Sequence, residues 1–322
     1  MDGETLVMAK SNENQGLIRI TIILVIISLM VSTIAIILSA TSLSREGTTI
    51  NVGDAGSTTG SSAGKLADDV WTFAIGHDGS NVEYFDHTSG TLRGFHVDIV
   101  NAVCAQANKN CRLIWDVYSN CWDSQAGQLA RGGNGLMGGW YDACTGWFNT
   151  YERALTFKFT NPIRKKFNGQ FFVKEGNPNS FNPTSIGSTQ KIGFGDGWST
   201  DEHCLGRNSD TISGVPLDPS QVVHYGDRNQ LIEAVNNNEA MAVFTNAHTL
   251  FNSGLQQVGP TITNCQRAGG SIMTPMQSTL PDWWNPAFDA LKQSGAYKDI
   301  CAKLDNEHGS QRGFGGDVVC LD

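Results

Sequence analysis

Charged residues are scarce in this sequence: they make up 16% of the chain, the formal net charge is -9, and no block of Lys and Arg occurs. No nucleic-acid partner is therefore expected, because binding to phosphates depends on clustered basic side chains. There is no Cys-x-x-Cys pair, no Cys/His cluster with zinc spacing, no HExxH motif and no phosphate-binding loop. We therefore expect neither a metal ion nor a cofactor.

Eight cysteines are present, and all of them lie C-terminal to the apolar run at residues 20–40. An even number indicates an oxidising compartment with up to four disulfides, although buried free thiols in a cytosolic protein are the alternative. Sequence alone does not determine the connectivity. We expect local pairing, namely Cys104 with Cys111, Cys121 with Cys144, Cys204 with Cys265, and Cys301 with Cys320.

Residues 20–40 form an uncharged apolar run in which 13 of the 21 residues are Ile, Leu or Val. A helix of this length spans about 30 Å, the thickness of the hydrocarbon layer. The run is longer than a typical signal-peptide core, and 19 residues precede it, so we expect an uncleaved signal-anchor helix. Cleavage after Ala40 is the alternative.

The cysteines orient the chain, because they belong outside the cytoplasm. Residues 1–19 are then a short cytoplasmic tail, and the protein is a single-pass membrane protein with an extracellular, periplasmic or lumenal C-terminal domain. Residues 41–68 are rich in Ser, Thr and Gly, which is typical of a flexible linker. The folded domain is expected over 69–322.

Short apolar segments alternate with amphipathic segments along the folded domain. Strands are expected at 71–78, at 111–118, in a segment ending at 143, at 191–197 and at 241–247; a loop is expected at 132–135. Helices are expected at 97–108, 199–206, 229–237 and 285–304. This alternation predicts an α/β fold with mainly parallel sheets.

Four stretches, in this order, resemble motifs of the family 3 solute-binding proteins, which have the type II periplasmic-binding-protein fold. They are residues 93–104, 138–163, 224–246 and 287–304. Ionotropic glutamate receptor ligand-binding cores share this fold. The resemblance implies a two-lobed clamp that closes on a small molecule. Lobe 1 would comprise about 70–172 and 268–322, and lobe 2 about 173–267.

The resemblance also implies a ligand site. Arg153 matches the Arg of the family's TPER motif, which binds the α-carboxylate of amino acids, although the segment from Asp142 to Arg153 is one residue shorter than in the family. Asn149 and Thr150 would line the same wall. Trp147 would stack on the ligand or belong to the core, and Tyr84, with Phe85, would form a lid or pack in a hairpin.

The second lobe would contribute Ser199 and Thr200, at a helix start suited to anions or capped by these hydroxyls. Asn246 stands where amino-acid binders usually carry the Asp that accepts the ligand's ammonium group. The ligand would then lack an α-amino group, or another acid would replace that Asp. Asp196 and Asp227 are the acids we consider for this role.

The function that follows is capture or sensing of a small anionic or amino-acid-like ligand, with a transporter or signalling protein as partner. The chain is not expected to be an enzyme. One alternative is a degenerate clamp used for protein contact. Another is a dehydratase-like enzyme on the same fold, with Glu83, Asp196 or Glu202 as general acid. A channel subunit is excluded because residues 165–190 are too polar to span a membrane.

Overall fold

The computed structural model describes most of the folded domain, which lies within one compact unit of residues 62–322. The described residues are 69–76, 80–124, 129–196, 199–246, 249–250, 252–309 and 314–322, and the side chains of 199 and 200 are not included. The expected tail, transmembrane helix and linker lie outside them. No helix in the described part has the length and apolar character needed to cross a membrane.

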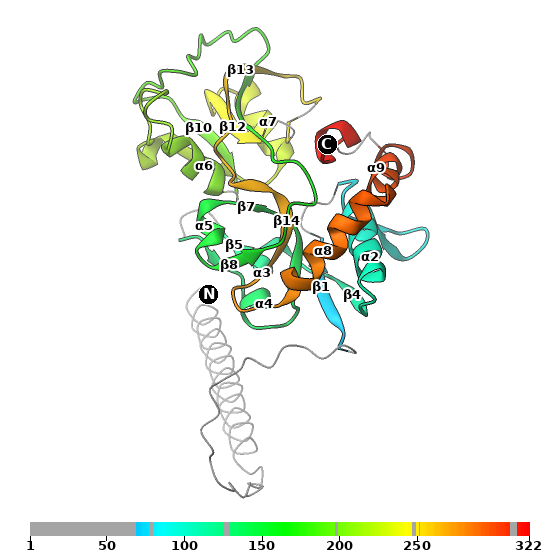
Figure 1. Ribbon diagram of the computed structural model, residues 1–322. Helices are drawn as coiled ribbons and strands as arrows, with labels where there is room; N and C mark the ends of the chain where they lie inside the picture. Colours follow the sequence, from blue (N-terminus) through cyan, green and yellow to red (C-terminus); the bar gives the residue numbers. More distant parts are fainter. Residues whose placement is uncertain are drawn as a thin grey trace, which may run out of the picture. The chain divides into compact units, whose positions relative to one another are not determined.

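Two five-stranded sheets organise the domain (Figure 1). The first has the order β4-β1-β7-β14-β8, where β1, β4 and β7 are parallel and β14 is antiparallel to β7 and β8. Its strands are β1 (Trp71–Ile75), β4 (Cys111–Trp115), β7 (Ala143–Asn149), β8 (Phe157–Phe159) and β14 (Ala268–Pro275). We refer to this sheet and the helices packed on it as lobe 1.

The two faces of the first sheet are covered by different elements. Phe73 of β1 is fully buried on the face covered by α2 (Phe95–Gln106), α8 (Leu280–Gln293) and α9 (Ala296–Asn306). Its neighbour Ala74 points to the other face and packs with α3 (Tyr118–Cys121), α4 (Asn134–Met137) and strand β5 (Trp122–Asp123). Burial on both faces explains why β1 is apolar apart from Thr72, as is usual for parallel strands.

The second sheet has the order β11-β10-β12-β9-β13 and, with its helices, forms lobe 2. Its strands are β9 (Gly169–Lys174), β10 (Ile192–Gly195), β11 (Val222–Tyr225), β12 (Ala242–Asn246) and β13 (Leu255–Ile262). Helix α6 (Ser199–Gly206) packs on one face with Phe244, and α7 (Arg228–Asn236) packs on the other face with Val243. A short 3-10 helix, η1 (Pro219–Gln221), precedes β11.

The chain passes between the sheets twice, from β8 to β9 and from β13 to β14. The two crossovers are linked, because the backbone N–H of Phe167 donates to Oε1 of Gln266 at 2.9 Å. Residues 169–172, assigned to lobe 1 from the sequence, belong to the second sheet instead. The correction follows from β9, whose residues from Gly169 onward pair with β12 and β13.

Two further expectations are corrected near the first sheet. The strand expected to end at Ala143 begins there, because the carboxylate of Asp142 accepts hydrogen bonds from the N–H and hydroxyl of Thr72 and anchors the preceding turn. The expected loop at 132–135 instead contains the last residue of β6 (Arg131–Gly132) and the first two residues of α4. The remaining elements are the hairpin β2 (Tyr84–Asp86) and β3 (Thr91–Arg93), α5 (Tyr151–Ala154) and α10 (Gly316–Val319).

Four disulfides are present, and no cysteine is free. The pairs are those expected from the sequence: Cys104–Cys111, Cys121–Cys144, Cys204–Cys265 and Cys301–Cys320. Three of them join elements of lobe 1. The pair Cys204–Cys265 joins α6 to the crossover that returns from β13 to β14.

Candidate functional site

Arg153 is placed by a short helix directly after β7. The strand ends at Asn149, and Thr150 is the N-cap of α5, where its hydroxyl accepts the N–H of Arg153 at 3.4 Å. Such a cap satisfies a backbone donor that the first helical turn leaves without a partner. The consequence is that Arg153 turns back into the protein, where it is only 4% exposed.

The guanidinium of Arg153 is held by neutral groups of lobe 1. Nη1 donates to the carbonyl of Phe148 at 3.1 Å, and Nη2 donates to the hydroxyl of Tyr118 at 2.5 Å. The group lies over the ring of Trp147, 4.6 Å from its centroid. Its Nε is buried and has no hydrogen-bond partner among the described residues. A buried cation with a spare donor is suited to an anionic ligand.

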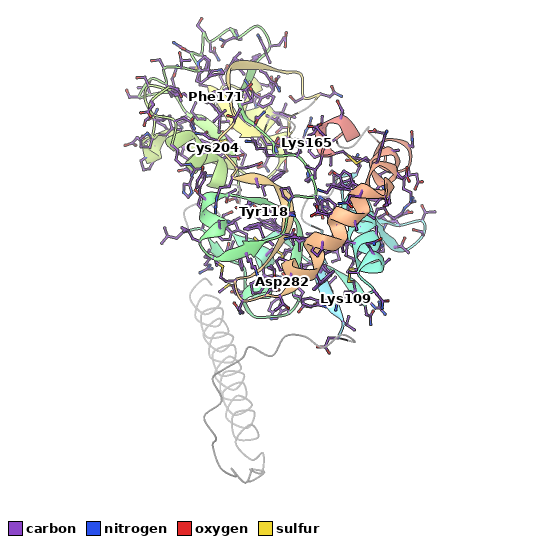
Figure 2. The ribbon with its side chains drawn as sticks, in the orientation of Figure 1. Lys109, Tyr118, Lys165, Phe171, Cys204 and Asp282 are labelled. Carbon is purple, nitrogen blue, oxygen red and sulfur yellow. A yellow bond between two sulfur atoms is a disulfide. The ribbon has the colours of Figure 1, made fainter. Side chains whose placement is uncertain are left out.

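Tyr118, which is labelled in Figure 2, is a residue that the sequence analysis missed and that accepts a hydrogen bond from Arg153. Its ring centroid lies 4.5 Å from that of Trp147. Burial raises the pKa of the Tyr118 hydroxyl above its usual range, against the lowering effect of Arg153. The hydroxyl therefore stays neutral, and it accepts a hydrogen bond from Arg153 without cancelling its charge.

Asp201 supplies an opposite charge from lobe 2. It lies in the first turn of α6, and the hydroxyl of Thr245 donates to it at 2.9 Å. Burial raises the pKa of Asp201 to about 6, against the lowering effects of the Thr245 hydroxyl, the Arg153 charge and the N–H of Asn246. Arg153 and Asp201 are thus within electrostatic range of each other, although they belong to different lobes.

The two acids considered from the sequence lie elsewhere. Asp227 caps α7, where Oδ1 accepts from the N–H groups of Asn229 and Gln230 at 2.8 and 2.9 Å. Asp196 is exposed in the turn after β10. Asp201 is within electrostatic range of Arg153 and accepts a hydrogen bond from the backbone N–H of Asn246. The acid close to Asn246 is therefore one that the sequence analysis did not consider.

The other expected ligand residues are distributed unevenly. Asn149 and Thr150 lie within four residues of Arg153, and Oδ1 of Asn149 is buried without a hydrogen-bond partner in the described part. Tyr84 instead contacts the C-terminal segment of lobe 1, with its hydroxyl 3.2 Å from Nδ1 of His308. The side chains of Ser199 and Thr200 lie outside the described residues.

The acids named for an enzymatic reading are each engaged with a histidine or exposed. Glu83 is 1% exposed and lies 3.0 Å from Nδ1 of His96, inside lobe 1. Glu202 lies 3.3 Å from Nε2 of His224 in lobe 2. Within the described ranges, no three His, Cys, Asp or Glu side chains are grouped as metal ligands.

The site as a whole lies where strands of both sheets end. Strand β7 is followed by α5, which carries Arg153. Strand β10 precedes α6, which carries Asp201, and β12 ends at Asn246. Ligands of open α/β sheets bind outside the carboxyl ends of the strands. The arrangement brings one cationic group and one anionic group together at such an edge, and this pair is suited to a ligand that bears both charges.

Solved structures with the same fold include solute-binding proteins and a sensor domain. A periplasmic His/Glu/Gln/Arg/opine family-binding protein from Silicibacter pomeroyi, in complex with lysine, shares 18% identity with a TM-score of 0.52, covering 76% of this chain and 99% of that one. An arginine-, lysine-, histidine-binding protein from Geobacillus stearothermophilus shares 18% identity with a TM-score of 0.52, and the match covers 75% of this chain and 97% of that one. A histidine kinase sensor domain shares 15% identity with a TM-score of 0.55, and the match covers 74% of this chain and 97% of that one.

At these identities the structures establish the fold alone. None of the curated proteins matches the chain. A sequence profile of the bacterial extracellular solute-binding proteins, family 3, matches residues 73–304, which is most of the chain and nearly all of both lobes. The chain belongs to the family 3 bacterial extracellular solute-binding proteins.

Proposed function

We propose that this protein is a membrane-anchored extracellular receptor that binds a small zwitterionic, amino-acid-like solute between its lobes. The observation that carries the proposal is that the charge of Arg153 in lobe 1 acts on the carboxyl group of Asp201 in lobe 2 and lowers its pKa. Solute-binding clamps close around their ligands, and each lobe contributes part of the site. A ligand with a carboxylate and an ammonium group satisfies both partly desolvated charges.

The roles follow from the donors and acceptors present. The unpartnered Nε of Arg153 and the forked guanidinium offer hydrogen bonds to a carboxylate. Asp201 accepts a hydrogen bond from an ammonium group. It thereby takes the role of the Asp that amino-acid binders usually carry at the position of Asn246. Trp147 and Tyr118 present ring faces beside the carboxylate site. Among the solved structures with this fold are one in complex with lysine and one named for arginine, lysine and histidine, which agrees with this class of ligand.

A thermal-shift screen tests the proposed ligand class. The full-length protein in nonionic detergent is heated with amino acids, with organic acids that lack an amino group, and with simple anions. A ligand at 100 times its dissociation constant adds about 2.7 kcal/mol to the free energy of unfolding. We expect stabilisation by amino acids and little by their des-amino analogues. Stabilisation by neither group would favour a clamp used for protein contact.

The pH dependence of binding provides a test of Asp201. Its pKa in the free protein is raised to about 6, and an ammonium group beside it lowers that pKa. Below pH 6, binding therefore releases a proton from Asp201. The affinity for the ligand is fully present above pH 6, and it falls by up to about tenfold per pH unit below pH 6. Calorimetry between pH 4.5 and pH 8, with the best amino acid from the screen, measures the profile.

Asp201→Asn is the matched variant for this test. It should bind the amino acid more weakly at pH 8 and lose the dependence below pH 6. A profile identical to that of the wild type would show that another group titrates.

The anchor is the second part of the proposal, and it rests on the apolar run at 20–40. Protease added outside intact cells should remove the C-terminal domain and leave the N-terminal tail protected. An N-terminal tag that antibody reaches without permeabilisation would contradict this orientation. A secreted form that begins near residue 41 would instead indicate a cleaved signal.

A further inference from the structure

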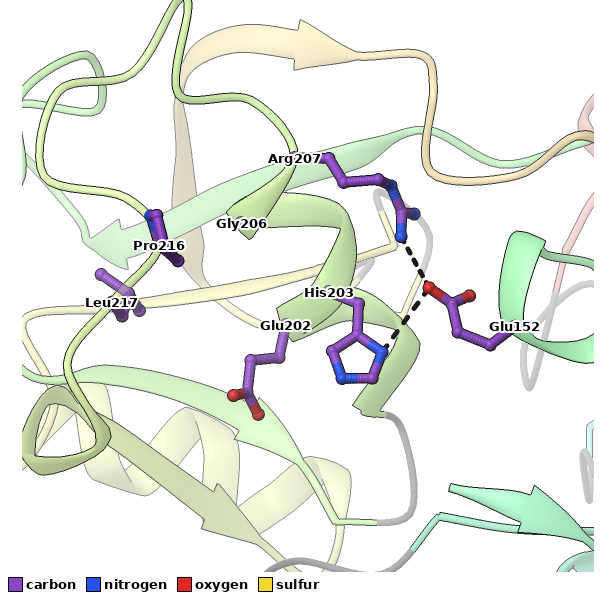
Figure 3. Close-up of a pocket in the computed structure, with 7 residues that line it drawn as sticks. All are labelled: Glu152, Glu202, His203, Gly206, Arg207, Pro216 and Leu217. Atoms are coloured by element: carbon purple, nitrogen blue, oxygen red, sulfur yellow. Dashed lines mark hydrogen bonds and ion pairs between the residues drawn. The ribbon is translucent and has the colours of Figure 1, made fainter. Parts of the chain in front are cut away.

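Helices α5 and α6 contact each other although they belong to different lobes. Oε1 of Glu152, on α5, accepts a hydrogen bond from Nη1 of Arg207 at 2.6 Å and lies 3.5 Å from Nδ1 of His203 (Figure 3). His203 lies on α6, and Arg207 is the first residue after the end of that helix. One carboxylate of lobe 1 is therefore bound by two basic groups of lobe 2.

A stacking contact adds to this ion-pair cluster. The guanidinium of Arg207 lies over the ring of Tyr151, 4.9 Å from its centroid. Tyr151 and Glu152 directly precede Arg153 in α5, so three consecutive residues of one short helix contact either lobe 2 or the candidate ligand site. Glu152, His203 and Arg207 also line a pocket of about 290 Å³, together with other residues of α6 and residues 216–217.

The charges in this cluster reinforce one another. Burial by itself would raise the pKa of Glu152, but hydrogen bonds from His203 and Arg207, together with the charge of Arg207, lower it to about 2. The hydrogen bond to Glu152 raises the pKa of His203; Glu202 acts in the same direction and Arg207 opposes it. Glu152 thus remains ionised throughout the neutral range, and contact with lobe 2 favours the protonated His203.

We propose that Glu152, His203 and Arg207 form an interlobe latch, in which these positioning residues hold the lobes together and keep Arg153 close to Asp201 whether or not a ligand is bound. A clamp that is already held closed loses less free energy on ordering when it binds. The latch therefore acts on ligand affinity through the lobe equilibrium, without contact between its residues and the ligand.

The contribution of His203 has a definite sign. Its pKa is raised in the latched arrangement, so its contribution is fully present below the ordinary histidine pKa and is lost as pH rises through the raised value. The charged groups that face His203 are Glu152, Glu202 and Arg207. The latch is consequently stronger at mildly acidic pH than at alkaline pH.

Hydrogen exchange without any added ligand tests the latch. The full-length protein in nonionic detergent is compared with Glu152→Gln and Arg207→Gln, and the protection factors of backbone amides in α5 and α6 are measured by mass spectrometry. The side chains of Glu152, Arg207 and His203 are 20%, 33% and 46% exposed, so solvent weakens the ion pairs between them. We therefore expect protection to fall by about two- to fivefold in each variant. In the wild type, protection of both helices should decrease above pH 7.

A double-mutant cycle separates the latch from a local structural effect. If the two side chains act through each other, Glu152→Gln combined with Arg207→Gln should lower protection no further than either change alone. Arg131→Ala is the matched control, because it breaks a 2.8 Å ion pair with Asp123 that lies wholly within lobe 1. Additive effects in the cycle, or unchanged protection of α5 in Arg207→Gln, would overturn the latch. No ligand is used, so the result is independent of the proposed ligand.

Discussion

Replacing Arg153 by alanine is expected to weaken binding of the best ligand by about 30-fold or more. The reason is that a carboxylate buried next to Trp147 would lose its charged partner, and truncating one member of such a pair costs about 2–5 kcal/mol. Calorimetry on the full-length protein measures the change. Arg153→Lys should restore only part of the affinity, because an ammonium group cannot form two parallel hydrogen bonds.

Arg153 also contributes to stability, so its variants need a folding control. The side chain is 4% exposed and donates to Phe148 and Tyr118, and its removal leaves the Tyr118 hydroxyl without that donor. The melting temperature of each variant is therefore measured beside its affinity. Arg112→Ala, which removes an Arg bonded to Asn110 and Cys111 within lobe 1, should leave affinity unchanged. Wild-type affinity in a folded Arg153→Ala protein would remove the carboxylate-binding role.

Loss of the disulfide between Cys204 and Cys265 is expected to be the largest effect on stability. This bond closes a loop of 61 residues, and the chain-entropy relation gives about 4 kcal/mol for such a loop. Denaturant unfolding of the variant with both cysteines changed to alanine, at constant detergent, should show this decrease. The bond also holds α6, so the ligand-dependent stabilisation should decrease with it.

The pair Cys104–Cys111 is the matched control. Its sequence separation is 7, for which the same relation gives about 2 kcal/mol. Removing it should therefore cost roughly half as much. It should leave ligand-dependent stabilisation unchanged, because it packs on the α2 face of the first sheet and Trp147 packs on the opposite face. Equal losses from the two double variants would contradict the loop-length argument.

The fold could be predicted because its information is spread over many residues. Apolar segments of strand length alternate with amphipathic segments along the whole domain, and four motifs follow in the order of the family. The cysteine pairs were predictable for a related reason, since each joins neighbours in sequence. The exact element ends were less predictable: α8 and α9 were expected as one helical region, but Gly295 has a φ of 85° and separates them.

Asp201 and Tyr118 could not be predicted because burial decided their roles. An Asp in the first turn of a helix is common, since it stabilises the N-terminal end of the helix dipole. Nothing local distinguishes such a residue from one that faces a charge in another lobe. Tyr118 lies in a four-residue helix with no periodic pattern, and its contact with Arg153 spans 35 positions of sequence.

Motif matching gave the prediction for Arg153, which stays a prediction, and it left out Asp201 and Tyr118. The match identified the Arg and the departure at Asn246, but it directed attention to acids close to strand ends. The contact of Glu152 with Arg207 joins residues 55 positions apart on two helices of different lobes. Because surface ion pairs of this kind depend on how lobes meet, no spacing rule within one element predicts them.

The order of the cysteine pairs has a consequence for export. In chain order the first cysteine is bonded to the second, the third to the fourth, the fifth to the sixth and the seventh to the eighth. When such a chain enters an oxidising compartment with its N-terminal side first, no more than one thiol waits for its partner at any stage. Native pairs can therefore form in step with translocation, and the slow reshuffling of wrong pairs, which takes seconds to hours, is largely avoided.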